Sequence, residues 1–246
     1  MIRLLTVATL MGASLGLATP AVSQDFTQDF QGFYAGLHLD MNTFVTNNAD
    51  LNNQFNSNAP EQSIFGATGG VSFGYNRYFS GGLLLGIELD YTSEMVIEEF
   101  IASNTSGTTG TQVNNALESV IAIKGRAGIQ SGNALLYVLG GYAMGSGVFE
   151  TYAVDSGSGL TSCSTSTCAS ISEDTNGVVI GAGVDWAFRE NWIGRFEVQH
   201  MTFSDVDAPV LDAGGDPACS SGATPLCSVV YTPSATSARL GIMYKF

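Results

Sequence analysis

Few residues in this 246-residue chain could take part in chemistry, because it holds only two histidines and four cysteines. His200 is followed by Thr202 and Ser204, which raises the question of a hydrolase. A hydrolase of this kind needs a nucleophile within hydrogen-bond reach of a histidine that an acid orients. His200-Met201-Thr202 does not match a His-x-Ser pattern, and His38 is expected inside the fold. We therefore expect no catalytic residue.

Two pairs of acids are the next candidates. Glu88 with Asp90 and Glu98 with Glu99 could be read as acid pairs or as a cation site. Glu88 and Asp90 alternate with apolar residues, which favours charge pairing on one face of a strand. Glu98 and Glu99 are more typical of a solvated loop than of a cation site. We expect no metal site and no cofactor.

The cysteines come late in the chain, in two close pairs. Cys163 stands near Cys168, and Cys219 near Cys227. No histidine stands near either pair, which argues against metal ligation, whereas export from the cytoplasm would permit disulfides. Two local disulfides are expected, and pairing between the two loops or free thiols are the alternatives.

Export is indicated by the first residues. Residues 1–23 are typical of a signal peptide, with Arg3, an apolar run over 4–17 and a small-residue stretch before Gln24. An uncleaved anchor is the alternative, but the run is shorter than the roughly 20 residues of a spanning helix. The mature chain, 24–246, is then a single domain. The formal charge of the full sequence, −14, argues against nucleic acid as a partner.

The positions that could do chemistry must be held by strands, because apolar and polar residues alternate with a period of two. Long polar loops alternate with tight turns between the strands. This is the layout of an antiparallel up-and-down barrel with all long loops at one rim. The eight predicted strands cover residues 32–44, 64–78, 83–95, 117–130, 134–149, 175–188, 192–204 and 234–246.

The two faces of these strands distinguish a membrane barrel from a soluble lipocalin-like barrel, which would carry its charges outside. One face is apolar throughout, as in Leu85, Ile87 and Leu89, while charges stand singly among glycines on the other face. Large side chains in a narrow lumen need small neighbours, so the charges are expected inside and the apolar face in lipid. Aromatic residues expected to form an interfacial girdle near the tight turns are Tyr75, Phe79, Trp186, Phe188, Trp192, Tyr244 and Phe246.

The inward charges form a predicted network in the lumen. Asp185 should lie opposite Arg195, and Arg239 level with Asp40. Glu88 and Asp90 should approach Lys124 and Arg126. The interior is then near neutral, and the excess acidity must lie mainly in the loops. The ten charges assigned inward are Asp40, Glu88, Asp90, Lys124, Arg126, Asp185, Arg195, Glu197, Arg239 and Lys245.

The chain resembles the small eight-stranded outer-membrane β-barrel proteins of Gram-negative bacteria, the porin-family or OmpA-like barrel domains. The resemblance is carried by GFYAGLHLD, AIKGRAGI, LYVLGGYAMG, GVVIGAGVDWAFRENWIGRFEV and the final ARLGIMYKF. It implies an eight-stranded antiparallel transmembrane barrel in the cell outer membrane, with short periplasmic turns and long extracellular loops. The last strand resembles the signal read by the barrel assembly machinery, through Leu240, Ile242, Tyr244 and Phe246.

The expected function is a structural and surface-interaction role in the cell envelope, without catalysis. Eight strands leave an interior just wide enough to be filled by side chains. A channel for small solutes is the alternative, and a lipid-modifying enzyme is a third. The expected partners are outer-membrane lipid and lipopolysaccharide, the assembly machinery, and an extracellular ligand at the loops.

Overall fold

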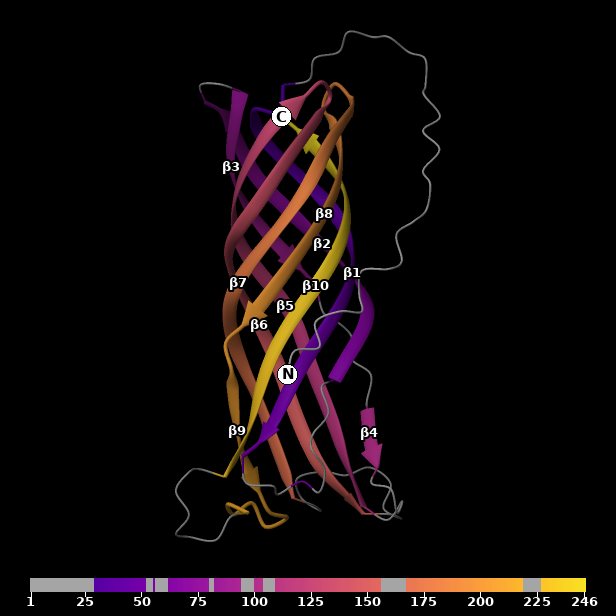
Figure 1. Cartoon of the computed structure of the whole chain (residues 1–246), viewed down its shortest axis with the longest axis vertical. Helices are drawn as coiled ribbons and strands as arrows, with labels where there is room; N and C mark the ends of the chain where they lie inside the picture. The colour runs from indigo at the N-terminus through magenta and orange to yellow at the C-terminus, as the bar shows by residue number, and fades with distance from the viewer. Residues whose placement is uncertain are drawn as a thin grey trace, which may run out of the picture.

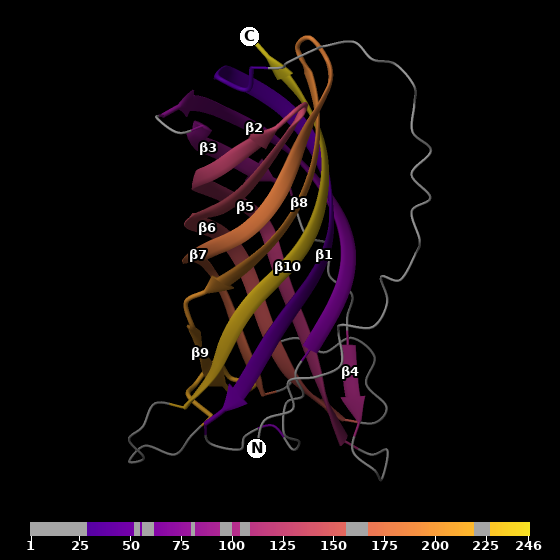
Figure 2. The same ribbon diagram turned by 45° about the horizontal axis from the view of Figure 1, so that its top comes forward.

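A computed structural model shows the chain as an elongated β-barrel (Figures 1 and 2). It describes residues 29–51, 55, 62–79, 82–93, 100–103, 109–155, 167–218 and 227–246. The predicted signal peptide, residues 1–23, lies outside these ranges. None of the described residues forms a helix that is long and apolar enough to cross a membrane.

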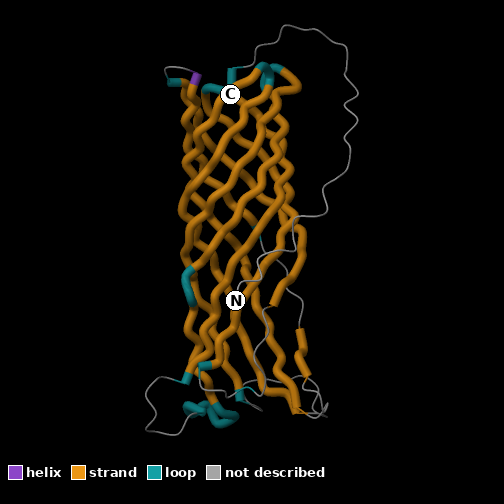
Figure 3. Tube along the Cα trace, in the orientation of Figure 1, coloured by secondary structure: helices purple, strands orange, loops and turns teal. Residues whose placement is uncertain are grey.

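Eight long strands make up most of the wall of the barrel, and two short strands, β4 and β9, extend it at its loop-bearing end (Figures 1 and 3). The strands are β1 (Gly32–Asp50), β2 (Gln62–Tyr78), β3 (Leu83–Thr92), β4 (Phe100–Ser103), β5 (Thr109–Ser131), β6 (Ala134–Asp155), β7 (Cys168–Arg189), β8 (Trp192–Phe203), β9 (Val206–Leu211) and β10 (Ser228–Lys245).

The long strands follow one another around the barrel in chain order, and each is antiparallel to its neighbours. The barrel closes where β1 pairs with β10, from Tyr34 opposite Lys245 to Asp50 opposite Val229. The predicted up-and-down barrel is confirmed. We call the end with the short connections β2–β3, β5–β6 and β7–β8 the tight-turn rim, and the opposite end the loop rim.

Five strands run six to eight residues further toward the loop rim than the sequence predicts. β1 ends at residue 50 instead of 44, β6 at 155 instead of 149, and β5, β7 and β10 begin six to eight residues earlier than expected. β9 continues the line of β8, since it pairs with both β7 and β10. β4 likewise continues β3 along β5. The barrel wall therefore extends well beyond the predicted strands on this side.

On β5 the extension was missed because the alternation changes phase where it begins. On β5 the buried positions are even-numbered from Val120 toward the turn, but odd-numbered at Leu117 and beyond, and the register shifts between Leu117 and Ser119. Glu118 is the extra, exposed residue of this β-bulge. A similar break at Ser204 and Asp205 separates β8 from β9. A strict period of two cannot follow a strand through such a point.

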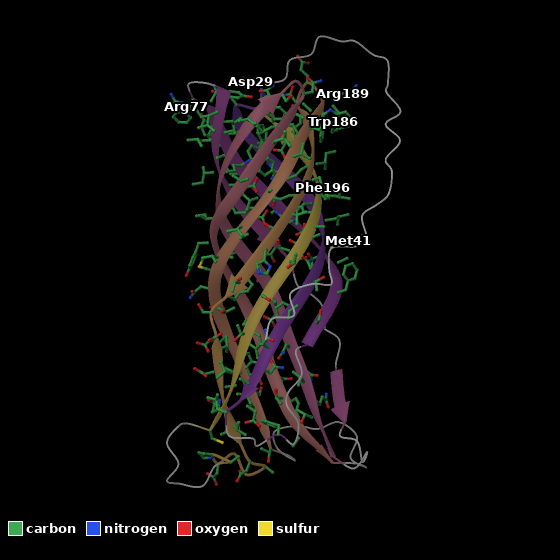
Figure 4. All side chains as sticks on the ribbon, in the orientation of Figure 1. Asp29, Met41, Arg77, Trp186, Arg189 and Phe196 are labelled. Carbon is green, nitrogen blue, oxygen red and sulfur yellow. The ribbon has the colours of Figure 1, made fainter. Side chains whose placement is uncertain are left out.

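The outer wall is apolar, as expected for a surface that faces lipid. Met41, Trp186 and Phe196 project from the wall at different heights (Figure 4). The predicted girdle is present at the tight-turn rim, where the Trp192 ring lies 5.2 Å from Tyr244 and the Tyr244 ring 5.4 Å from Phe246. The Trp and Tyr rings are amphipathic and are therefore suited to the membrane interface.

Two tight turns show how the rim is built. Gly132 occupies the β5–β6 turn with φ +59°, a left-handed conformation that residues other than glycine adopt at a cost. In the β7–β8 turn the Asn191 side chain donates to the Lys245 carbonyl (2.7 Å), and the Lys245 amide donates to the Asn191 carbonyl (2.8 Å). This turn is thereby fastened to the last strand.

Inward glycines make room for large side chains in the lumen. A Cβ atom on Gly183 would stand 2.5 Å from the Tyr137 hydroxyl and 2.8 Å from the Phe196 carbonyl oxygen. A Cβ on Gly74 would meet the Tyr34 hydroxyl, and one on Gly70 the His38 ring. The expectation that small residues face large ones inside the lumen is confirmed.

We predict that Gly183→Ala destabilises the barrel by about 1–3 kcal/mol, because the added methyl overpacks a filled interior. Gly140→Ala is the matched control, since a Cβ there faces outward and meets nothing closer than the Val179 carbonyl oxygen at 3.8 Å. Urea unfolding in lipid vesicles compares the two. Equal stabilities for the two variants would contradict the account of a tightly filled lumen.

The cysteines lie at the loop rim. Cys168 and Cys227 each take part in a disulfide. They flank β9, because Cys168 is opposite Leu211 and the Cys227 carbonyl accepts from the Val210 amide. Cys163 and Cys219 are outside the described residues, so the pairing remains a prediction. We expect Cys163–Cys168 and Cys219–Cys227 bonds, each contributing about 2–3 kcal/mol at most. Peptide mapping without reduction would reject this by finding peptides linked between the two loops.

Candidate functional site: a charge layer in the lumen

Inward faces of six strands bring charged side chains together in the middle of the lumen, where they are almost completely buried. Alternation explains their placement, since each stands at an inward position of its strand. We call this set the charge layer. Its members are Asp40 on β1, Glu88 and Asp90 on β3, Lys124 and Arg126 on β5, Asp185 on β7, Arg195 and Glu197 on β8, and Arg239 on β10.

The structure places nine of the ten predicted charges in this layer and puts Lys245 elsewhere. Lys245 is only half-buried at the tight-turn rim, where its Nζ donates to the Asp29 carbonyl oxygen (2.5 Å). The reason is its position as the last residue of β10, where the inward direction leads to the mouth of the barrel. The tenth assignment was therefore wrong.

Glu88 is the centre of the charge layer. Its Oε1 lies 2.9 Å from Lys124 Nζ, and its Oε2 lies 2.5 Å from a terminal nitrogen of Arg195. Arg126 stands at 3.5 Å from the same Oε2, and the Tyr34 hydroxyl donates to it at 2.6 Å. One carboxylate from β3 thus binds groups on β1, β5 and β8, across the full width of the lumen.

A second group is organised by Arg239. Its Nε lies 2.7 Å from Asp40 Oδ1, and one terminal nitrogen lies 2.7 Å from Asp90 Oδ2. The Ser72 hydroxyl also donates to Asp90 (2.7 Å). Lys124 joins the two groups, since its Nζ reaches both Glu88 and Asp90. The layer is therefore one connected network.

The third group contains the pair that the sequence set opposite each other. Asp185 and Arg195 are register partners, and their Oδ1 and Nε atoms lie 2.8 Å apart. Arg126 contributes a second guanidinium, 2.5 Å from Asp185 Oδ2. Glu197 completes the layer 3.3 Å from Lys124 Nζ. Hydrogen-bonded charge pairs of this kind hold each other in place, and removing one partner strands the other.

Two tyrosines belong to the site although the sequence analysis did not identify them. Tyr34 and Tyr137 lie on either side of the guanidinium groups, with Arg126 3.9 Å from the centre of the Tyr137 ring and Arg195 5.4 Å from that of Tyr34. The Tyr137 hydroxyl donates to Glu197 (2.9 Å). Alternation could have found both, since Tyr34 stands two residues before Gly36 on the inward face of β1 and Tyr137 faces inward on β6.

His38 supplies what the charge layer lacks. With five carboxylates and four basic side chains the layer has a formal charge of 4 − 5 = −1. His38 Nδ1 lies 3.2 Å from Asp40 and its Nε2 3.3 Å from Asp90. Of these two contacts, the one between Nδ1 and Asp40 has hydrogen-bond geometry, and an imidazolium at this place would bring the total charge to zero.

Apolar side chains close the lumen on both sides of the charge layer. The tight-turn side is closed by Phe30, Leu84, Leu135, Ala187, Ile193 and Met243. The loop side is closed by Phe44, Leu117, Val120, Ala143, Phe149, Val179, Met201, Phe203, Tyr231 and Ala235. An ion would have to cross both apolar layers as well as the paired charges, which is costly.

The remaining candidates do not join this site. His200 is exposed on the outer wall, and its described hydrogen-bond partners are the hydroxyls of Thr236 (2.9 Å) and Thr202 (3.3 Å). Glu98 and Glu99 lie outside the described residues. The residues expected to carry the assembly signal all face outward, along β10 and at its end. They are Leu240, Ile242, Tyr244 and Phe246.

A model of the outer membrane protein beta-barrel domain family matches residues 6–246. No curated protein is similar enough to this chain to count as a match. Solved structures with a similar course of the chain include OprG from Pseudomonas aeruginosa, which is 14% identical with a TM-score of 0.41 and covers 90% of this chain and 99% of its own.

Two further solved structures show how varied such proteins are. The outer membrane protease OmpT from Escherichia coli is 9% identical with a TM-score of 0.46, covering 91% of this chain and 99% of its own. Ail, the attachment invasion locus protein of Yersinia pestis, is 10% identical with a TM-score of 0.34, covering 86% and 99%. The likeness is too distant to carry an argument about activity.

We predict that Arg195→Ala and Asp185→Ala each destabilise the barrel by about 3–5 kcal/mol, because each leaves a buried charge without its partner. The double variant should cost less than the sum of the two single changes. Urea unfolding of the four proteins in lipid vesicles measures this. Strictly additive losses would show that the two side chains do not depend on each other.

Proposed function

Because this chain belongs to the outer membrane protein beta-barrel domain family and resides in the cell outer membrane, we propose that it is a non-enzymatic envelope protein. In this proposal the barrel is a closed scaffold, and the loop-side half is a surface for interaction. The observation that carries the proposal is the filled lumen, in which a paired charge layer lies between two apolar layers.

The surroundings of the two histidines are the observations behind the non-enzymatic part of the proposal. His38 lies between two carboxylates, and His200 hydrogen-bonds to Thr236 and Thr202 on the outer wall. A hydroxyl nucleophile is activated by a histidine that an acid orients. Among the described hydrogen bonds of His200, none is to a carboxylate.

The distribution of charge supports the interaction part. The sequence contains eight Lys and Arg residues. Four lie in the charge layer, Arg77, Arg189 and Lys245 lie at the tight-turn rim, and Arg3 is outside the described ranges (Figure 4). The loop-side half therefore presents acids unopposed by bases. Its exposed acids are Glu118, Glu173, Asp174, Asp205, Asp207 and Asp216.

The partner that such a surface favours is a molecule with a basic face. Like-signed charges spread over one surface raise the local potential and attract oppositely charged partners, with strong dependence on salt. Hydroxyl groups hold some of the acids in place, as Ser146 does for Asp174 (2.6 Å) and Thr232 for Asp205 (2.7 Å). The other proposed partners are outer-membrane lipid, lipopolysaccharide and the assembly machinery.

Purified protein in planar bilayers tests the closed scaffold. We expect little or no conductance, because ions would have to pass the charge layer and both apolar layers. Detergent without protein is the control for accidental leaks. Stable, large single-channel steps from the folded protein would place a channel for small solutes ahead of the scaffold.

Binding of a decalysine peptide to protein in lipid nanodiscs tests the surface. Replacing Glu173, Asp174, Asp205 and Asp207 by their amides should weaken binding roughly tenfold, since each exposed charge contributes about 0.2–1 kcal/mol. Asp29→Asn with Glu190→Gln, at the opposite rim, is the matched control and should change little. An affinity that is independent of salt, or equal in both variants, would refute the electrostatic surface.

A further inference from the structure

A row of uncharged polar side chains lies directly beside the charge layer, on its loop side. Asn42 on β1 is opposite Ser237 on β10, and Ser237 is opposite Gln199 on β8. All three point inward and are at least 97% buried. We call Asn42, Ser237 and Gln199 the amide row.

The amide row separates two very different environments. Two residues toward the tight turns, the same three strands carry Asp40, Arg239 and Glu197 of the charge layer, again as register partners. Two residues toward the loops, they carry Phe44, Ala235 and Met201, which are buried and apolar. The row is thus the boundary at which the interior changes from ionic to apolar.

Several polar atoms of the amide row have no partner in the protein. Both Gln199 Nε2 and Oε1, Ser237 Oγ and Asn42 Oδ1 are buried without a hydrogen bond, although Asn42 Nδ2 donates to Thr68 Oγ1 (2.8 Å). Leaving such atoms unpaired in an apolar interior is costly. Three neighbouring side chains sharing this condition indicate a bound occupant.

The chemistry of the row restricts that occupant. Gln199 Nε2 needs an acceptor, while Gln199 Oε1 and Asn42 Oδ1 need donors. A metal ion would satisfy the oxygens and leave the amide nitrogen unpaired, and an anion would do the reverse. Glycine is the register partner at both ends, Gly66 beside Asn42 and Gly181 beside Gln199, and the β2 side chain that contacts the row is Thr68, two residues beyond Gly66.

We propose that the amide row is a site for a small cluster of bound water molecules, enclosed between the charge layer and the apolar layer on the loop side. Water both donates and accepts, and bound water typically makes about three hydrogen bonds to buried polar groups. The cluster hydrates the loop-side edge of the charge layer at Asp40 and Glu197. It is enclosed and does not form a path through the barrel.

Solution NMR of the full chain in micelles tests the site directly. The side-chain amide protons of Gln199 should show cross-peaks to water with the sign of long-lived bound water. The methyl groups of Leu84 and Leu135, in the apolar layer on the other side, are the control and should show none. Absence of the Gln199 cross-peak, or the sign given by rapidly exchanging solvent, would overturn the proposal.

Replacing residues of the amide row by apolar ones gives an independent test. The urea midpoint should change in opposite directions depending on whether the row binds water. Gln199→Met and Asn42→Leu should lower the urea midpoint in lipid vesicles, because bound water loses its partners. In a dry row the same changes would remove unpaired polar atoms and raise the midpoint. Thr43→Val, on the outer wall beside Asn42, is the control and should not share the loss. An unchanged or raised midpoint for both inward variants would refute the water site.

Discussion

The ion pairs of Glu88 across the lumen are the interaction on which the rest of the structure depends. Taking charges from water into a confined interior is costly, and the cost is offset only when every charge has well-placed partners. Glu88 meets this condition with Lys124, Arg126, Arg195 and Tyr34, which come from strands on different sides of the barrel. The network therefore specifies the distance between opposite walls, which backbone pairing between neighbours does not.

Other features follow from this central layer. Glycines stand where the large side chains need room, as Gly183 does for Tyr137. Apolar side chains above and below exclude bulk water, which strengthens the pairs and makes an unpaired charge more costly. The same arrangement leaves the lumen near neutrality. The acidity of the whole protein is thus concentrated on the loop-side half, away from the membrane-spanning part of the wall.

Much of the barrel could be predicted from the sequence, because a period of two assigns each side chain to lipid or lumen once the phase is known. Asp185 opposite Arg195 follows from folding the hairpin at its turn, and Arg239 level with Asp40 from closing the sheet. The β5 part of the loop-side extension could not be found this way, since the bulge at Glu118 reverses the phase of that strand. Lys245 was misplaced because alternation gives a direction and not a depth.

The cation–π contacts and the role of His38 were also beyond the sequence. Tyr34 and Tyr137 could be assigned inward, but their approach to Arg126 and Arg195 depends on how the barrel is sheared when it closes. His38 could be placed inside, whereas its position between Asp40 and Asp90 joins strands that are not neighbours. Contacts across the lumen depend on the radius of the whole barrel, and local patterns carry no information about that radius.

The bulge at Glu118 and the break at Ser204 and Asp205 have a consequence for how the protein can vary during evolution. Each absorbs a change of phase, so insertions or deletions on the far side need not propagate into the membrane-spanning rows. The loop-side extension can then lengthen, shorten or acquire a new sequence while the pairing around Glu88 keeps its register. On β5 and at the junction of β8 and β9, the lumen register around Glu88 and the loop-side pairing can thus change independently of each other.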